Sequence, residues 1–333
     1  MNKSVELPLV RPIYSTYHFQ GSGAAILAAN PSIRNWYLNQ VMILSCDQRF
    51  FAGHTSPELN IQDSFWSDNH HLEQHSYPMR FLNGQAGPII RAMLDDGFYV
   101  YFEKADDYYI KGKSWYHQRH FAHDGLICGY NQAERTYSIY AYDTDWIYQR
   151  FATPQKAFHA GQKAAQEQGE EGFIHAVRPL AREVAFDPAV VYHKLLEYLD
   201  SSLEKYPPGM TPGVYGIAVQ EYIAWYLDRL LDGSVPYERM DRRVFRLIWE
   251  HKAVMLERIQ KTEAAFELSR AISSQYQHLV SRANAMRMLY ASHHIKRRDS
   301  VLPVIRRDLL WLKDEEQKLL TQFTDQLGGV QKQ

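Results

Sequence analysis

Cysteine is scarce in this sequence, since Cys46 and Cys128 are the only two among 333 residues. A disulfide framework of the kind that holds small secreted domains together is therefore excluded as the basis of the fold. The scarcity favours a reducing compartment, and we predict a cytoplasmic protein. It also leaves only two thiols as candidate nucleophiles.

Long hydrophobic runs and an excess of charge of one sign are also missing. No stretch approaches the roughly 18 apolar residues of a membrane-spanning helix, and no apolar signal-peptide core follows Met1. The 37 lysines and arginines nearly cancel the 38 aspartates and glutamates. These absences predict that the protein neither spans a membrane nor binds nucleic acid through its overall charge.

Aromatic and β-branched residues are concentrated in three short segments that predict β-strands. These segments are residues 98–102, 121–130 and 137–142, and turn-forming residues separate them. They predict an antiparallel meander, preceded by a helix over 87–94. Gly125 and Gly129 lie inside the second strand, where glycine predicts the close approach of another backbone.

The sequence after about residue 180 has the periodicity of amphipathic helices. The predicted helices cover residues 192–203, 215–231, 242–260, 264–294 and 304–327. Long helices joined by short links are typical of a bundle. We therefore predict an α+β fold in which residues 1–178 form an α/β domain with an antiparallel sheet and residues 179–333 form an all-helical domain.

The candidate catalytic pair consists of His123 on the second predicted strand and Asp143 after the third. A turn near residues 132–134 would place them opposite each other, with Cβ atoms about 4.5–5.5 Å apart. A carboxylate there fixes the imidazole tautomer and leaves the second ring nitrogen available as a base. The same spacing also fits a purely structural His–Asp pair, so both interpretations stay open.

Several short motifs occur in a recognisable order. They are Gly97-Phe98-Tyr99-Val100, Asp107-Tyr108-Tyr109-Ile110, the His123 strand ending in Gly129-Tyr130, Tyr142-Asp143, Tyr215-Gly216-Ile217, and Trp249-Glu250-His251-Lys252 followed by Arg258. In this order they resemble the butirosin biosynthesis protein H family, whose N-terminal domain is papain-like. The resemblance covers most of residues 85–325 and is carried by short motifs.

The resemblance implies an acyltransferase or amide-forming enzyme of peptide and amino-sugar antibiotic biosynthesis. Such enzymes transfer an acyl group from the phosphopantetheine thioester of a carrier protein, often within a nonribosomal peptide synthetase, to an amine. The implied partner is that carrier, and the implied enzyme needs no metal or cofactor of its own. The resemblance assigns the role of base to His123 and the role of its orienting partner to Asp143.

The nucleophile is where this sequence departs from the family pattern. The family's cysteine begins the first long helix, and by chain order that position falls near Trp36. Cys46 lies about ten residues further on, or about 15 Å along a helix. Cys46 is nevertheless the better candidate thiol, because Cys128 lies on the His123 strand itself, where it is expected to pack as a small apolar residue.

Other residues and other functions stay open at this level. Gln40 is a candidate oxyanion donor, and Trp36 and Tyr130 are candidate substrate contacts. A reaction without a thiol is possible if His123 deprotonates an amine that attacks the thioester directly. The alternatives are a non-catalytic, degenerate domain that binds an assembly-line partner, and a metal enzyme built on the histidines at 117, 120 and 123 or at 70, 71 and 75.

Overall fold

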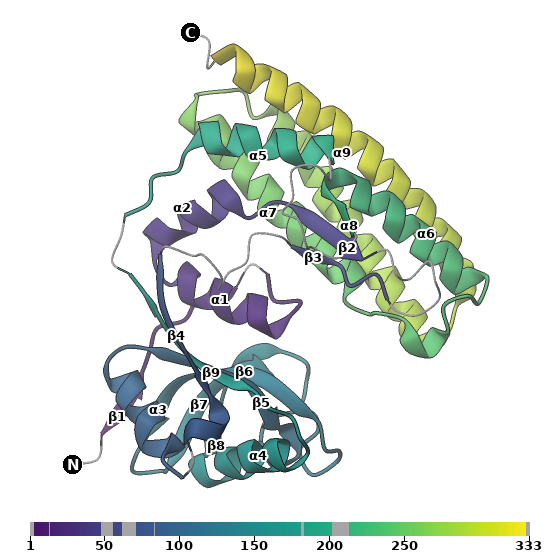
Figure 1. Cartoon of the computed structure of the whole chain (residues 1–333). Helices are drawn as coiled ribbons and strands as arrows, with labels where there is room; N and C mark the ends of the chain where they lie inside the picture. Colours follow the sequence, from purple (N-terminus) through teal and green to yellow (C-terminus); the bar gives the residue numbers. More distant parts are fainter. Residues whose placement is uncertain are drawn as a thin grey trace. The chain divides into compact units, whose positions relative to one another are not determined.

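The computed structural model describes residues 3–12, 14–47, 56–61, 71–82, 84–180, 183–201 and 213–330. The chain forms two compact units, a sheet unit of Met1–Arg34 with Ser64–Glu183 and a helical unit of Asn35–Asp63 with Val184–Gln333 (Figure 1). The predicted change of character near residue 178 falls close to the last crossing between the units, at residues 183 and 184. Residues 35–63, which the sequence placed with the sheet, belong to the helical unit.

The sheet unit contains a seven-stranded sheet in its described part, and all of its strand pairs are antiparallel. The strands are β1 (Ser4–Glu6), β4 (Leu72–Pro78), β5 (Tyr99–Asp106), β6 (Ala122–Asn131), β7 (Thr136–Tyr142), β8 (Tyr148–Pro154) and β9 (Phe173–Pro179). Their order is β4-β9-β5-β6-β7-β8, with β1 paired to the end of β6. The predicted meander is confirmed as β5-β6-β7.

Three helices cover this sheet on its two faces. They are α1 (His18–Ala28), α3 (Ala86–Asp95) and α4 (Gln155–Glu167). On β6, Ile127 packs in a core with Ile90 of α3 and Phe158 of α4, whereas Asp124 contacts His18 of α1. Because the side chains of Asp124 and Ile127 leave opposite faces of the strand, α1 lies on one face and α3 and α4 lie on the other.

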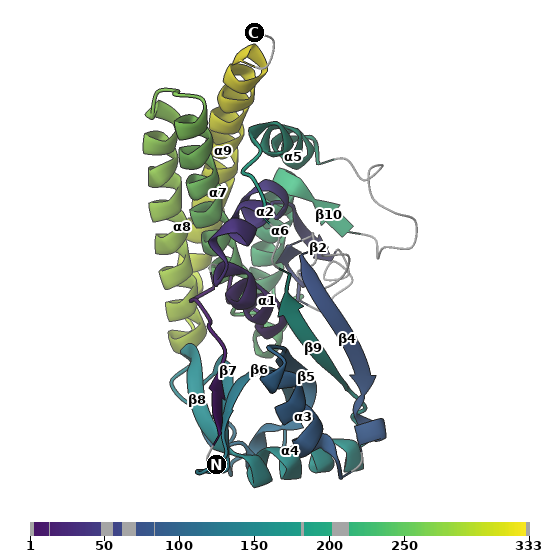
Figure 2. The same cartoon turned by 90° about the vertical axis from the view of Figure 1, so that its left-hand side faces the viewer.

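The helical unit confirms the five helices predicted after residue 180. They are α5 (Pro188–Asp200), α6 (Val219–Leu231), α7 (Val244–Ala265), α8 (Ala271–Lys296) and α9 (Leu302–Val330), which lie side by side in both views (Figure 1 and Figure 2). A small sheet of β2 (Leu44–Asp47), β3 (Asn60–Ile61) and β10 (Gly213–Tyr215) completes the unit, together with the part of α2 (Pro31–Gln40) that follows Arg34. None of the described helices has the combination of length and apolar character that crossing a bilayer requires.

Two buried side chains of α7 explain why the segment after α2 belongs to the helical unit. The Arg258 guanidinium donates to the carbonyls of Leu38 (2.5 Å) and Val41 (2.6 Å). His251 Nε2 lies 2.8 Å from the Met42 carbonyl oxygen. The last carbonyls of a helix lack intrahelical partners. The buried guanidinium and imidazole therefore supply hydrogen-bond partners to carbonyl groups that would otherwise be buried without any.

The five helices α5 to α9 also meet at one buried carboxylate, Glu316 of α9. It accepts hydrogen bonds from Lys252 Nζ of α7 (2.6 Å), the Tyr198 hydroxyl of α5 (3.1 Å) and the Gln220 amide of α6 (2.7 Å). The Tyr276 hydroxyl of α8 donates to its second oxygen. Each helix of the bundle therefore supplies one member of a single polar cluster.

Candidate functional site

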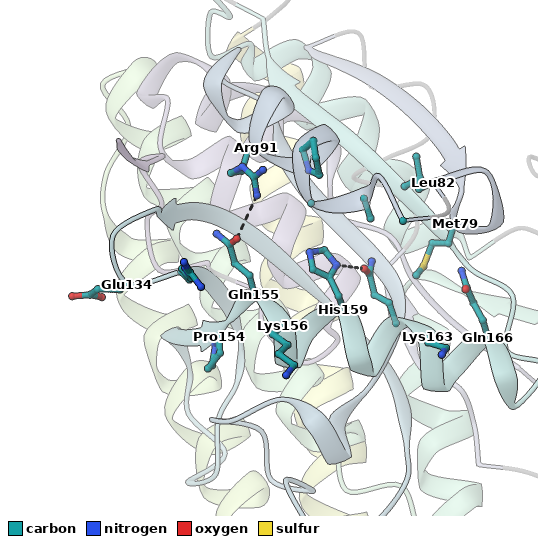
Figure 3. Close-up of a pocket in the computed structure, with 16 residues that line it drawn as sticks. Met79, Leu82, Arg91, Glu134, Pro154, Gln155, Lys156, His159, Lys163 and Gln166 are labelled. Carbon is teal, nitrogen blue, oxygen red and sulfur yellow. Dashed lines mark hydrogen bonds between the residues drawn. The ribbon is translucent and has the colours of Figure 1, made fainter. Parts of the chain in front are cut away.

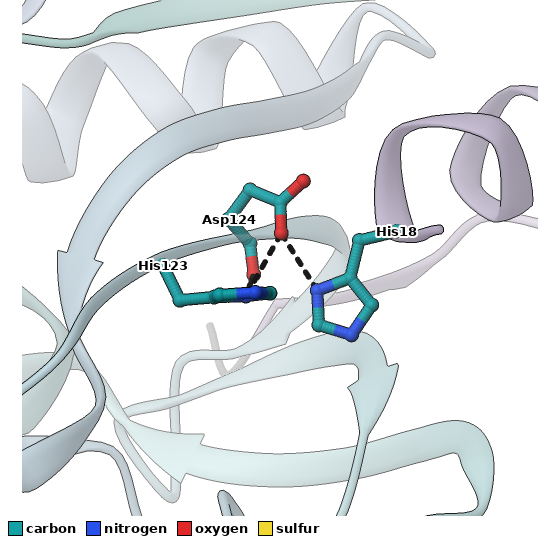
Figure 4. Close-up of side chains that lie close together, drawn as sticks. All are labelled: His18, His123 and Asp124. Atoms are coloured by element: carbon teal, nitrogen blue, oxygen red, sulfur yellow. Dashed lines mark hydrogen bonds and ion pairs between the residues drawn. The ribbon is translucent and has the colours of Figure 1, made fainter. Parts of the chain in front are cut away.

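Two imidazoles and one carboxylate converge on the α1 face of the sheet unit (Figure 4). His18 is the first residue of α1, and its Nδ1 lies 2.6 Å from Asp124 Oδ1. The neighbouring residue on β6, His123, places its Nδ1 2.9 Å from the same oxygen. The two rings meet edge to face, with centroids 4.5 Å apart.

A β-bulge lies at the point where these residues meet. Phe102 of β5 pairs with Gly125, but Ala105 pairs with His123, so β5 has an extra residue opposite Asp124. Successive side chains of an ideal strand point to opposite faces, and a regular ladder would keep His123 and Asp124 apart. A bulge increases the local twist and redirects side chains, which accounts for their contact here.

Asp124 is held as an ionised acceptor by groups on several elements. Its Oδ2 accepts a 2.5 Å hydrogen bond from the Tyr101 hydroxyl of β5, and its backbone carbonyl accepts from Lys113 Nζ at 3.0 Å. Burial opposes ionisation of this carboxyl, yet its interactions with the His18 and His123 rings, including a hydrogen bond with each, hold the pKa of Asp124 well below its usual range. The carboxylate is thus fixed in position and negatively charged.

His18 is buried and neutral. Burial and the nearby charge of Lys113 lower the pKa of His18 to about 4, despite the adjacent Asp124 carboxylate. The backbone N–H of Tyr142 donates to His18 Nε2 at 3.3 Å, so the ring proton resides on Nδ1 and is donated to Asp124. His18 therefore orients the carboxylate and is a poor candidate for proton transfer.

His123 has the arrangement of a general base. Its side chain is 34% exposed, and Nδ1 lies 2.9 Å from Asp124 Oδ1 and 3.4 Å from the Asp124 backbone carbonyl oxygen. Both atoms are acceptors, so the ring proton resides on Nδ1 and the lone pair on Nε2. The His123 ring contacts Asp124, His18 and Phe121, and among the described residues no thiol or hydroxyl hydrogen-bonds to it. An oriented, accessible imidazole of this kind can accept a proton from a bound reactant.

The same three residues bring their donor atoms within 4.8 Å of one another, close enough for one metal ion. Metal ligation by His18 Nδ1 would require the ring proton on Nε2, where it would clash with the N–H of Tyr142. The hydrogen-bonding pattern therefore fits a His–Asp–His cluster better than a metal centre. In the predicted histidine clusters, His120 binds Asp106, His75 binds Glu73, and residue 70 lies outside the described residues.

Asp143 does not orient His123. The Asp143 Oδ1 accepts from the backbone N–H groups of Asp145 and Ile147, both at 2.9 Å, and its second oxygen accepts from the Gln149 amide. The carboxylate closes the turn between β7 and β8 instead. The carboxylate beside the His123 ring is that of Asp124, which the sequence did not single out.

The other predicted site residues lie away from this cluster or outside its unit. Trp36 lies in the middle of α2 and Gln40 ends it, so neither stands at a helix N-terminus. Cys46 lies on β2 of the helical unit. Tyr130 is on β6, but its hydroxyl donates to Asp95 at 2.7 Å. The helix whose N-terminus does contact His123 is α1, which begins at His18.

We expect both thiols to react slowly in the native protein. Cys46 and Cys128 are buried, and burial raises the pKa of each thiol to about 12. Because the thiolate is the reactive form, iodoacetamide at neutral pH should label neither residue until urea unfolds the chain. Mass spectrometry of labelled peptides measures this, and fast native labelling of Cys46 would restore it as a candidate nucleophile.

We also expect His18 to make stability depend on pH. The unfolded His18 binds a proton below its ordinary pKa of 6.5, whereas the folded residue stays neutral until about pH 4. The unfolded state therefore gains protons on acidification, and this one group should lower the free energy of unfolding by about 2 kcal/mol between pH 7 and pH 5. The pKa of Asp124 lies below this range, so its own titration does not contribute.

The urea midpoint of wild type and of His18→Asn at the two pH values measures this effect. Asparagine keeps a donor near the Nδ1 position but does not titrate, so its midpoint should fall less on acidification. Equal falls in both proteins would contradict a neutral, buried His18.

The fold and the site together define a mixed α/β protein whose antiparallel sheet carries an oriented His–Asp pair. No model of a known protein family matches this chain, and the comparison with curated proteins finds no relative. The function must therefore be argued from the site itself.

Proposed function

We propose that the sheet unit is a papain-like acyl-transfer domain that forms an amide without a thiol nucleophile. The substrate is an aminoacyl or peptidyl thioester carried on the phosphopantetheine of a carrier protein, in the biosynthesis of a peptide natural product. The observation that carries this proposal is the 2.9 Å contact between His123 Nδ1 and Asp124 Oδ1, beside a ring that is one third exposed.

Because the ring proton of His123 resides on Nδ1, its Nε2 can act as the base in the reaction. The amine nitrogen attacks the thioester carbonyl while His123 Nε2 takes its proton. The C–S bond then breaks, and the imidazolium returns the proton to the departing thiolate. The Asp124 carboxylate favours the imidazolium that forms between these steps.

The N-terminus of α1 supports the same assignment. Helix N-termini carry a partial positive charge and favour developing negative charge. His18, the first residue of α1, packs against the His123 ring with centroids 4.5 Å apart. An oxyanion formed next to His123 would therefore lie close to the positive end of a helix.

The test is a carrier protein loaded with an aminoacyl phosphopantetheine thioester and mixed with a panel of amines. We expect equal amounts of amide and free carrier thiol by mass spectrometry, unchanged by a chelator and unchanged in Cys46→Ala and Cys128→Ala. Carrier binding without loss of the thioester would instead indicate an accessory protein. Loss of turnover with the chelator would indicate a metal enzyme.

A further inference from the structure

A cavity of about 900 Å³ lies in the sheet unit next to α3 and α4 (Figure 3). It is lined by the first turn of α3 and one face of α4. The segments that precede these two helices and the turn between β6 and β7 complete the lining. These helices cover the sheet face opposite to α1, so the cavity is separate from the cluster at His123. Its volume is in the range that binds small organic molecules.

The lining is strongly cationic. Arg91, Arg135, Lys156 and Lys163 line the cavity together with a single carboxylate, Glu134. Arg91 donates to the amide oxygen of Gln155 and thus points a guanidinium at a neutral group. Lys163 pairs with Glu167 on the exposed side of α4 at 3.6 Å, a contact that water screens. Four cations facing one carboxylate favour an anionic occupant.

A buried donor without a partner lies in the same lining. Gln162 is 5% exposed, and its amide nitrogen has no hydrogen-bond partner. The Tyr137 hydroxyl donates to His159 Nε2 (3.3 Å), and His159 Nδ1 donates to the Gln162 carbonyl oxygen (3.0 Å). Burial lowers the pKa of His159, which keeps the ring neutral in this series of hydrogen bonds. The Gln162 N–H₂ group therefore remains a buried donor without a hydrogen-bond partner in the wall of the cavity.

The start of α3 adds the positive end of a helix dipole. Ala86, Gly87 and Pro88 form its first turn and line the cavity. A Cβ on Gly87 would lie only 3.2 Å from His159 Nε2, so glycine allows the backbone of this turn to lie close to His159 and its hydrogen-bond partner Gln162. Free N–H groups at a helix N-terminus bind phosphate and other anions.

The lining also has an apolar part. Met79, Leu82, Pro88 and Pro154 contribute hydrocarbon surface. An inorganic ion would leave this part of the cavity unused, whereas an anion attached to an apolar body would fill both parts. A phosphate monoester matches the four cations better than a carboxylate does, because it carries nearly two charges and three acceptor oxygens.

We propose that this cavity binds a small organic phosphate, with its phosphate among Arg91, Lys156 and the first turn of α3 and its apolar body against Met79 and Leu82. Gln162 donates to a phosphate oxygen. The proposal is independent of the reaction at His123, since the two sites use different residues on opposite faces of the sheet.

Isothermal titration of the full chain with phenyl phosphate tests this assignment. We expect saturable binding that weakens as salt is added, weaker binding of inorganic phosphate, and still weaker binding of benzyl alcohol and benzoate. Absence of saturable binding by phenyl phosphate would overturn the proposal. Binding of benzyl alcohol or benzoate as tight as that of phenyl phosphate would overturn it as well.

Variants locate the binding. Arg91→Met, Lys156→Met and Gln162→Leu should each weaken phenyl phosphate about tenfold, since each removes a donor to a charged group. Lys111→Met is the matched control, because Lys111 is an exposed lysine of the same unit that does not line the cavity. Lys156 is exposed, so its variant keeps the test valid if the others fail to fold. Equal affinities of Lys156→Met and Lys111→Met would overturn the proposed location.

Discussion

Replacing His123 with glutamine is expected to lower the rate of amide formation from a carrier-bound thioester by about 10²- to 10⁴-fold, the usual contribution of a general base. Glutamine can still donate a hydrogen bond to Asp124, but it cannot accept a proton at neutral pH. Because the His123 side chain is one third exposed, the fold should be retained. Single-turnover mass spectrometry of the loaded carrier measures the rate, and the urea midpoint checks the fold.

Two aspartate variants serve as matched controls. Asp124→Asn removes the charge that orients His123 and should also reduce the rate strongly. Asp143→Asn should leave it unchanged, because an amide oxygen can still accept from the backbone N–H groups of Asp145 and Ile147. A loss of activity in Asp143→Asn, with activity retained in Asp124→Asn, would contradict the assignment of the carboxylate. Full activity of His123→Gln would remove the proposed base.

Replacing Lys252 with methionine is expected to destabilise the helical unit by about 3–5 kcal/mol. Lys252 and Glu316 are both fully buried, with Nζ and Oε2 2.6 Å apart. Methionine has a similar volume but leaves the Glu316 carboxylate without a cation. That group must then stay charged in the core or take up a proton, and either outcome costs free energy. Urea unfolding followed by circular dichroism measures the loss.

A second substitution separates the charge from the packing. In Lys252→Met with Glu316→Gln, the uncompensated charge is gone while the side-chain volume is similar, so much of the lost stability should return. Lys318→Met on the exposed side of α9 is the control and should leave the midpoint unchanged. A double variant as unstable as Lys252→Met alone would show that packing, rather than charge, is responsible.

Helical periodicity and the concentration of aromatic and β-branched residues were sufficient to predict many of the regular elements. The predicted helix over 242–260 is α7, and the predicted strands over 98–102 and 121–130 are β5 and β6. The glycine prediction is confirmed at Gly129, where a Cβ would collide with the backbone of Val5 on β1, but at Gly125 a Cβ would meet the Phe102 side chain instead of a backbone. Such features depend on residues close in sequence or on the absence of a side chain.

The same patterns did not predict the polar edge strand or the small sheet. The edge strand β4 is mostly half-buried or exposed, so its side chains do not alternate between apolar and polar. Tyr215 was predicted as the start of a helix, but it ends β10 (Gly213–Tyr215), which pairs with β2 far away in the sequence. Long-range pairing of this kind overrides local propensity.

The sequence by itself determined that His123 lies on a strand of an antiparallel meander and that a bundle follows. The predicted register also holds where the two strands pair next to the site, since Leu126 pairs with Tyr140 and Ile127 with Ile139, yet the Asp143 carboxylate binds the turn between β7 and β8 and not His123. Only the tertiary structure decided which carboxylate serves the imidazole. A bulge contributed by β5 and a helix beginning at residue 18 place Asp124 of β6 beside the two imidazoles. Both come from other parts of the chain, so no pattern within residues 121–143 indicates them.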